Sequence, residues 1–260
     1  MSEGPRVLVT RTANQAAAFS QKLWAAGFTP VEFPAIQLES LPWAPLDAAL
    51  SELSSFDWLI FTSGNAVDFF LRRVDELGLL LDNLPRVAAV GSATARQLAE
   101  RDIAIDYMPD EFVGTELVLG LGDLTGQKVL LPRAKIGRPE IADLLQEQGA
   151  ELTEVALYDT VTAVPTPQAW TELNKGFAAI TFTSPSSVRN FCKIMADNPA
   201  RLAVPLDKLL LHVPVICIGP VTAEAAAEVG LADSLIPDEY TIDGMVQQLK
   251  NALFEVNTDD

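Results

Sequence analysis

Histidine and cysteine are scarce in this sequence of 260 residues, which has one histidine, His212, and two cysteines, Cys192 and Cys217. Two cysteines among apolar neighbours cannot build a disulfide framework and are typical of small buried side chains. One histidine and two cysteines are too few for a typical zinc site of the His/Cys type, which is therefore close to excluded. A Ser-His-Asp triad would have to use His212, but this residue lies in an apolar run that approaches an expected strand. A structural histidine is therefore favoured over a catalytic base.

Basic residues and phosphate-binding motifs are also scarce. The sequence has 18 lysines and arginines against 35 acidic residues, a formal net charge of −17, which disfavours nucleic acid and anionic membranes as partners. It has no GxxxxGK(S/T) loop, no GxGxxG after a strand, and no paired acidic cluster of the kind that holds magnesium. The sequence therefore shows no motif of a nucleotide-binding or magnesium-dependent protein.

A membrane-spanning run and a signal-peptide core are missing as well. The longest apolar stretch, near residues 209–219, is interrupted by His212 and Pro214 and is too short to span a bilayer. We expect a soluble, cytoplasmic protein. Apolar residues make up 49% of the chain and charged residues 20%, which is a globular composition. The length suits one large domain or two domains of roughly 120–130 residues.

Short apolar runs alternate with amphipathic stretches along the whole chain. The apolar runs predict strands at residues 6–10, 58–62, 86–90, 128–132, 179–183 and 214–218. Runs that are continuously apolar are typical of strands covered on both faces. The alternation of strands and helices predicts an α/β fold with parallel sheets.

Three pairs of segments recur in the same order along the chain. They are VLVTR at 7–11 with VLLPR at 129–133, FTSG at 61–64 with FTSP at 182–185, and GSATA at 91–95 with GPVTA at 219–223. The helices expected after the first pair end at Gly27 and Gly149, as glycine C-caps do. The helix after FTSG has an apolar stripe at Val67, Phe70, Leu71 and Val74. The chain therefore reads as two copies of one α/β unit.

The repeat alone leaves the domain boundary open. A plain tandem would divide near residues 120–126. In a swapped arrangement, the first strand–helix unit of the chain would complete the C-terminal domain. The extended stretches 33–39 and 152–162 suit the swap as paired crossings, and the second is rich in β-forming residues.

Hydroxyls, glycines and arginines follow the expected strands, at the edge where parallel sheets bind ligands. Helix N-termini there offer N–H groups and a dipole that suit carboxylates. The alternative is that Ser63, Thr94, Ser184 and Thr222 are ordinary N-caps. The repeated Arg11 and Arg133 would hold carboxylates bidentately, or else lie solvated in turns. Tyr158, in the segment VALYDT at 155–160, would face a cleft if this segment crosses between domains, or else pack against a strand.

Taken in order, these motifs resemble the uroporphyrinogen-III synthase family over about residues 6–250. The resemblance is carried by LVTR at 8–11, FTS at 61–63, VGSATA at 90–95, VALYDT at 155–160, TFTSPS at 181–186 and IGPVTA at 218–223. It implies two similar parallel-sheet domains with three α/β/α layers, joined by a two-stranded linker, with the substrate in the cleft between them. It also implies the swap, with residues 1–36 and 163–260 in one domain, 40–158 in the other, and 36–40 and 154–163 as the connecting strands.

The resemblance further implies a cyclising lyase that uses no cofactor and no metal. The family removes water from the linear tetrapyrrole hydroxymethylbilane, which carries eight carboxylates, closes the ring and inverts ring D to give uroporphyrinogen III. By the same resemblance, Tyr158 assists the departure of the hydroxyl as a proton donor or by positioning water. We expect a monomer that could receive its substrate from hydroxymethylbilane synthase. The expected substrate-binding residues are Arg11, Thr62, Ser63, Gly91, Thr94, Arg133, Ser184, Ser186, Gly219 and Thr222.

Two other functions stay open at this point. The first is a two-domain sensor that binds a small anionic ligand in a hinge cleft without chemistry, and it would need no Tyr158 at the site. The second is a sugar- or nucleotide-dependent transferase of α/β type, which the missing phosphate and metal motifs disfavour.

Overall fold

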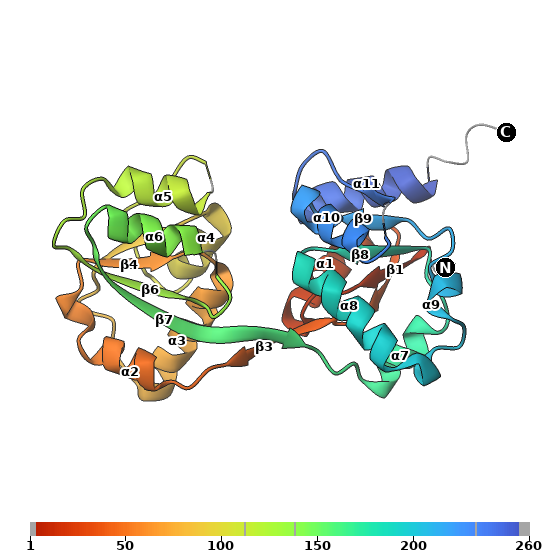
Figure 1. The fold of residues 1–260 in the computed structure, drawn as a ribbon, viewed down its shortest axis with the longest axis horizontal. Coiled ribbons are helices and arrows are strands. Elements are labelled where there is room, and N and C mark those ends of the chain that lie inside the picture. The colour runs from red at the N-terminus through yellow and green to blue at the C-terminus, as the bar shows by residue number, and fades with distance from the viewer. Residues whose placement is uncertain (1–3, 112, 138, 232, 255–260) are drawn as a thin grey trace. The chain divides into compact units, whose positions relative to one another are not determined.

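The computed structural model describes residues 4–111, 113–137, 139–231 and 233–254. The outer ends of the expected swapped domain, residues 1–3 and 255–260, lie outside this part. The chain divides into two compact units (Figure 1): unit 1 runs up to Leu38 and again from Val161 onward, and unit 2 is Glu39–Thr160. The boundaries fall within β3 (Ile36–Ser40) and β7 (Glu151–Thr162), which are hydrogen-bonded neighbours in one sheet. No helix of the described residues is long and apolar enough to cross a membrane.

Unit 1 is built on a sheet with the strand order β10-β9-β8-β1-β2, in which each pair of neighbouring strands is parallel. Val7 and Val9 pack with Phe19 in one apolar cluster, whereas Leu8 packs with Phe191 in another. Because successive side chains of a strand point to opposite faces, these clusters cover the two faces of the sheet. The elements of unit 1 are β1 (Arg6–Val9), α1 (Ala13–Ala25), β2 (Thr29–Glu32), α7 (Pro167–Leu173), β8 (Ala179–Phe182), α8 (Pro185–Asp197), a 3-10 turn (Pro199–Arg201), α9 (Leu206–Leu209), β9 (Val215–Cys217), α10 (Pro220–Glu228), β10 (Ser234–Leu235) and α11 (Ile242–Phe254).

Unit 2 has the strand order β3-β7-β6-β4-β5. Ile60 packs with Leu117 and Leu145 in one cluster, whereas its neighbour Phe61 meets the ring of Phe70 edge-on, with 5.3 Å between the ring centroids. Helices therefore cover both faces of this sheet too, giving three α/β/α layers. Besides β3 and β7, the elements of unit 2 are α2 (Ala44–Ser51), a 3-10 turn (Leu53–Ser55), β4 (Trp58–Phe61), α3 (Gly64–Leu77), β5 (Arg86–Ala89), α4 (Ser92–Ala99), α5 (Gly114–Leu121), β6 (Lys128–Ala134) and α6 (Pro139–Glu147).

All six strands expected from the apolar runs are present, and the prediction of an α/β fold with parallel sheets is confirmed. The glycines expected after α1 and α6 have positive φ, 88° at Gly27 and 86° at Gly149. Two strands were not expected. β2 begins two residues after Gly27 and contains Pro30, and β10 has only two residues, so neither leaves an apolar run in the sequence.

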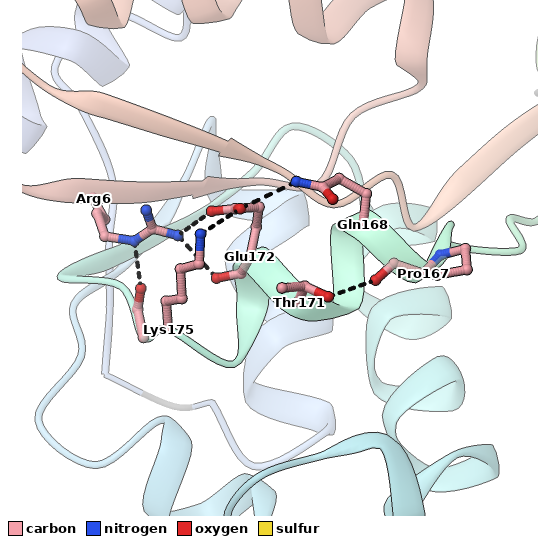
Figure 2. A network of polar contacts seen from close by, with 7 residues as sticks. Arg6, Pro167, Gln168, Thr171, Glu172 and Lys175 are labelled. Atoms are coloured by element: carbon pink, nitrogen blue, oxygen red, sulfur yellow. Dashed lines mark hydrogen bonds and ion pairs between the residues drawn. The ribbon is translucent and has the colours of Figure 1, made fainter.

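A polar network joins the start of the chain to its C-terminal half within unit 1 (Figure 2). Arg6 Nε donates to the backbone oxygen of Gly176 at 2.9 Å, and Arg6 Nη2 donates to the Glu172 backbone oxygen at 2.9 Å and to Glu172 Oε2 at 3.1 Å. Lys175 Nζ donates to the other carboxylate oxygen of Glu172 at 2.6 Å. The first strand of the chain is thereby tied to α7 and to the turn that leads into β8, its neighbour in the sheet.

Candidate active site

Unit 2 carries a pocket at the carboxyl ends of three adjacent strands. Its volume is about 200 Å³, and its lining residues are Thr62, Ser63, Leu131, Arg133, Ala134, Ile136, Gly137, Ile141 and Tyr158. We call it the Tyr158 pocket. It brings together four of the site residues predicted for this unit: Tyr158 from β7, Arg133 from β6, and Thr62 and Ser63 from the turn after β4. It does not include Gly91 or Thr94, which follow β5.

A break in the pairing of β6 with β7 sets the position of Tyr158. Arg133 pairs with Ala156 but Ala134 pairs with Tyr158, so Leu157 is the extra residue of a bulge. A bulge interrupts the alternation of side chains and re-aims the residue that follows it. Leu157 and Tyr158 are accordingly both buried, with 4% of Tyr158 exposed. Its ring packs as the alternative sequence interpretation expected, while the residue still lines the pocket.

The hydroxyl of Tyr158 lies beside a helix N-terminus. Tyr158 Oη is 3.4 Å from Ser63 Oγ, and either hydroxyl can donate. Ser63 is the N-cap of α3, where its Oγ accepts a hydrogen bond from the Ala66 N–H at 3.3 Å. Ser63 therefore serves as a cap and as a pocket residue at once. The α3 dipole adds positive potential at this end of the helix, where an anion would be stabilised.

Arg133 differs from the turn residue that we expected. β6 extends to Ala134, so Arg133 lies within the strand, and its side chain is 12% exposed. Arg133 Nη1 donates to Glu154 Oε2 at 2.8 Å. A Cβ atom on Gly137 would come within 2.4 Å of Arg133 Nε, so the pocket wall closes tightly around the guanidinium. The charge of Arg133 is already balanced by a carboxylate of its own unit.

In unit 1, the five predicted residues follow three adjacent strands, with Arg11 after β1, Ser184 and Ser186 after β8, and Gly219 and Thr222 after β9. Ser184 Oγ accepts from the Ser187 N–H at 3.2 Å and lies 3.1 Å from Ser186 Oγ. Ser184 caps α8 with φ −165° and ψ 155°, and Ser63 caps α3 with φ −159° and ψ 151°. The two turns thus have the same shape, although Gly64 stands where the second copy has Pro185.

The N-cap interpretation is wrong for Thr94 and Thr222. The caps of α4 and α10 are Gly91 and Gly219, and each threonine is the third residue of its helix, with 6% and 3% of the residue exposed. A Cβ atom on Gly219 would make only ordinary contact with the ring of Tyr240, at 3.5 Å. The two threonines are therefore buried in the first turns of their helices.

The single histidine and the two cysteines belong to unit 1, and none of them lines the Tyr158 pocket. His212 is exposed, with φ 59°, in the turn before β9, so it is not a buried core side chain. Burial raises the pKa of the Cys192 thiol, and it raises the pKa of Cys217 to about 11, which keeps both thiols protonated at neutral pH. Among the described residues no group of three or more His, Cys, Asp and Glu side chains could hold a metal ion.

Phe69 and Glu154 are two residues that the sequence did not single out. Phe69 of α3 stacks on the Tyr158 ring, and Glu154 of β7 pairs with Arg133. Phe69 lies outside the apolar stripe of its helix yet is 7% exposed. A large aromatic residue beside such a stripe is the signal that could have indicated a second contact face. Glu154 leaves no such signal, because its partner depends on the register of β6 and β7.

Comparison with known proteins identifies relatives over nearly the whole chain. The family model described as uroporphyrinogen-III synthase HemD matches residues 17–247. The uroporphyrinogen-III synthase of Synechococcus elongatus is 34% identical over 249 residues, which cover 94% of this chain and 93% of that protein.

Solved structures of two other relatives share the fold. That of a mutant uroporphyrinogen III synthase from Thermus thermophilus has a TM-score of 0.62 at 22% identity and covers 97% of this chain and 100% of its own. That of the Helicobacter pylori uroporphyrinogen-III synthetase has a TM-score of 0.61 at 21% identity, with coverage of 96% and 98%. Both likenesses support a two-domain α/β fold with parallel sheets.

Proposed function

Because the chain belongs to the uroporphyrinogen-III synthase family, we propose that the Tyr158 pocket is where water leaves hydroxymethylbilane. The family is one of cyclising lyases of porphyrin and haem biosynthesis, which convert hydroxymethylbilane into uroporphyrinogen III. Since the matches span nearly the whole chain, this is the reaction of the chain. The alternative of a ligand sensor without catalysis is not supported.

The size of the pocket supports a role at one end of the substrate. At about 200 Å³, it is smaller than the roughly 300–1,000 Å³ of sites that enclose a whole drug-sized ligand. It suits one terminal pyrrole with its hydroxymethyl group rather than a linear tetrapyrrole. The other rings and most of the carboxylates would then bind outside this pocket.

The observation that carries the proposal is the placement of the Tyr158 hydroxyl, which lines the pocket and lies 3.4 Å from Ser63 Oγ. Hydroxide is a poor leaving group, so a donor near the hydroxymethyl oxygen aids its departure. The C–O bond breaks with its electron pair going to oxygen, which takes a proton from Tyr158 and leaves as water. The pyrrole nitrogen supplies electrons to the carbon left behind, giving an azafulvene-type cation. The cationic carbon bonds to the ring D carbon that carries the bridge to ring C, and the bond from that ring D carbon to the bridge then breaks. The bridge carbon, now the second azafulvene-type cation, bonds to the free α-carbon of ring D. That α-carbon loses its proton, which restores Tyr158, and ring D is inverted.

The remaining residues act by positioning the substrate. The linear chain can close without inversion to the wrong isomer, so the enzyme must favour one arrangement of the two reacting ends. Thr62 and Ser63 offer hydroxyls in the pocket, and Ser184 and Ser186 offer them at the N-terminus of α8. With a net charge of −17, the chain must bind a polycarboxylate through such local donors.

Three further proposals concern how the enzyme works in the cell. We propose that it acts as a monomer, in the cytoplasm, and receives its substrate from hydroxymethylbilane synthase. The support for hand-over is chemical, since a substrate that closes spontaneously to the wrong isomer gains from a short path between the two enzymes.

Product analysis tests the proposed function. The protein is added to freshly made hydroxymethylbilane without metal or nucleotide, and the isomers of uroporphyrinogen are separated. Mainly the type III isomer is expected, at a rate that a chelator does not reduce. Type I product at the level found without enzyme would overturn the proposal.

A further inference from the structure

The internal repeat gives the two units an arginine at the same position relative to their strands. Arg11 stands two residues beyond Val9 of β1, and Arg133 stands two residues beyond Leu131 of β6. The strand beside each also presents a glutamate in register, since Val9 pairs with Glu32 and Leu131 pairs with Glu154. The two units therefore carry an arginine and a glutamate at matching positions.

The two arginines have different hydrogen-bond and ion-pair partners. Arg133 forms an ion pair with Glu154, with 2.8 Å between Nη1 and Oε2. Glu32 instead accepts a hydrogen bond from Ser20 Oγ at 2.6 Å. Arg11 donates through Nη2 to the neutral amide oxygen of Gln15 at 3.1 Å, and its buried Nε has no hydrogen-bond partner. No ion pair joins Arg11 to a carboxylate of the described residues.

A buried arginine without an ion pair is suited to bind an anionic ligand. Burial without a counter-charge lowers the pKa of the Arg11 guanidinium from its ordinary value, which shows that the charged form is held at a cost. A ligand carboxylate would supply the missing negative charge, and a guanidinium can receive it through two parallel hydrogen bonds. The next strand, β8, ends at the Ser184 and Ser186 hydroxyls, at the N-terminus of a helix of 13 residues, so more donors stand at the same edge.

We propose that Arg11 binds a carboxylate of the linear tetrapyrrole, and that Arg133 does not bind one because Glu154 already neutralises it. The inference rests on the proposed function and makes it more specific. Unit 1 thus has an arginine that binds substrate, whereas the matching arginine of unit 2 shapes the wall of the Tyr158 pocket.

Steady-state kinetics with fresh hydroxymethylbilane distinguish the two arginines. Arg11→Gln should raise KM roughly 10- to 100-fold, the effect of losing one charge-assisted contact. Its melting temperature should change little, because Arg11 makes a single hydrogen bond to a neutral partner. Arg11→Lys keeps the positive charge but cannot make two parallel hydrogen bonds to a carboxylate. It should therefore recover part of the affinity that Arg11→Gln loses. Arg133→Gln should raise KM less and lower the melting temperature, because it breaks an ion pair.

A matched control removes the same charge elsewhere in unit 1. Arg201 is exposed in the 3-10 turn that follows the C-terminal end of α8, so Arg201→Gln should leave KM unchanged. Added salt gives a second readout, because screening weakens a charge pair. The ratio of KM between Arg11→Gln and the unaltered protein should shrink as salt rises, which a purely structural arginine would not cause.

The outcomes separate this inference from the proposed function. If the unaltered protein makes no type III isomer, the proposed function fails. If it does, but Arg11→Gln has a KM within twofold of normal, or Arg133→Gln raises KM as much as Arg11→Gln does, the inference about Arg11 is overturned. A KM increase in Arg11→Gln that accompanies a lower melting temperature and does not depend on salt would also overturn it.

Discussion

The ring of Tyr158 lies on the ring of Phe69, with centroids 4.7 Å apart and planes 18° from parallel. The guanidinium carbon of Arg72 lies 4.6 Å from the Phe69 centroid, and Arg72 Nη2 donates to Ser40 Oγ at 2.8 Å. Phe69 thus contacts both a cation and a second aromatic ring, and both contacts are favourable. The stack leaves the Tyr158 ring little freedom and keeps its hydroxyl beside Ser63, where the proposed chemistry needs it.

Phe69→Leu should therefore lower the rate through Tyr158. Leucine keeps the site apolar but cannot stack, which removes a contact of about 0.5–1.5 kcal/mol. We expect kcat to fall by a few-fold to about tenfold. If Phe69 acts only by positioning the hydroxyl, the same substitution should cause no further loss in a Tyr158→Phe background, which a double-mutant cycle measures.

The neighbouring Phe70 provides the control for Phe69. It lies on the same helix but contacts Phe61 in the core instead of Tyr158. Phe70→Leu should lower the melting temperature at least as much, while kcat of the folded protein stays close to normal. If Phe69→Leu and Phe70→Leu reduce kcat equally, or if the losses from Phe69→Leu and Tyr158→Phe simply add, Phe69 does not position Tyr158.

Much of the fold could be predicted from the sequence because the buried strands are short, continuous apolar runs. The segment around Trp58 and that around Ala179 bury both faces of each strand, so they stand out against the polar turns that follow. β2 could not be predicted in this way, since its residues Thr29–Glu32 include a proline and a glutamate. What makes it a strand is pairing with β1, a long-range contact that leaves no local pattern.

The candidate site was predictable in its location but not in its contacts. Strand ends with hydroxyls and glycines correctly indicated Ser63 and Ser184 as caps. The same reasoning was wrong for Thr94, because it placed the start of the helix at the hydroxyl instead of at Gly91. The difference between Arg11 and Arg133 could not be predicted. It depends on whether the glutamate of the neighbouring strand bonds to the arginine, as Glu154 does, or to another side chain, as Glu32 does to Ser20.

The division into two units predicts which half of the chain folds alone. A fragment of residues 39–160 retains β4, β5, β6 and β7 with their covering helices, so it should melt cooperatively. A fragment of residues 1–121, of almost the same length, has β1 without β8 and β4 without β6. It should show no cooperative transition by circular dichroism or calorimetry. A cooperative melt of 1–121 together with none for 39–160 would favour a plain tandem arrangement.

Glu172 should make unit 1 sensitive to acid. Hydrogen bonds from Lys175 and Arg6 hold the pKa of the Glu172 carboxyl below its ordinary value of 4.5. A carboxyl whose pKa is lower in the folded state stabilises the fold above its unfolded pKa, and this contribution is lost as the pH falls through the folded pKa. The melting temperature of Glu172→Gln should therefore lie below normal at pH 7, and the difference should shrink below about pH 4.5.

The control for this pH dependence is Glu224→Gln. Glu224 is exposed on α10 in the same unit and makes no ion pair with a described residue. Its substitution should not change the melting temperature at either pH. A difference between Glu172→Gln and the unaltered protein that is equally large at pH 7 and pH 3 would mean that the network around Arg6 does not depend on the carboxylate charge.

The most direct test of the account is the rate at which Tyr158→Phe forms uroporphyrinogen III. The substitution removes only the hydroxyl that lies 3.4 Å from Ser63 Oγ and keeps the ring that stacks on Phe69. General-acid assistance is typically worth about 10²–10⁴-fold, and because the pyrrole nitrogen already drives the hydroxyl out, we expect a fall of roughly 10- to 100-fold. The melting temperature should change little, and the product should remain type III. Full activity in Tyr158→Phe, or a loss of activity that simply follows unfolding, would contradict the account and leave Tyr158 as a packing residue.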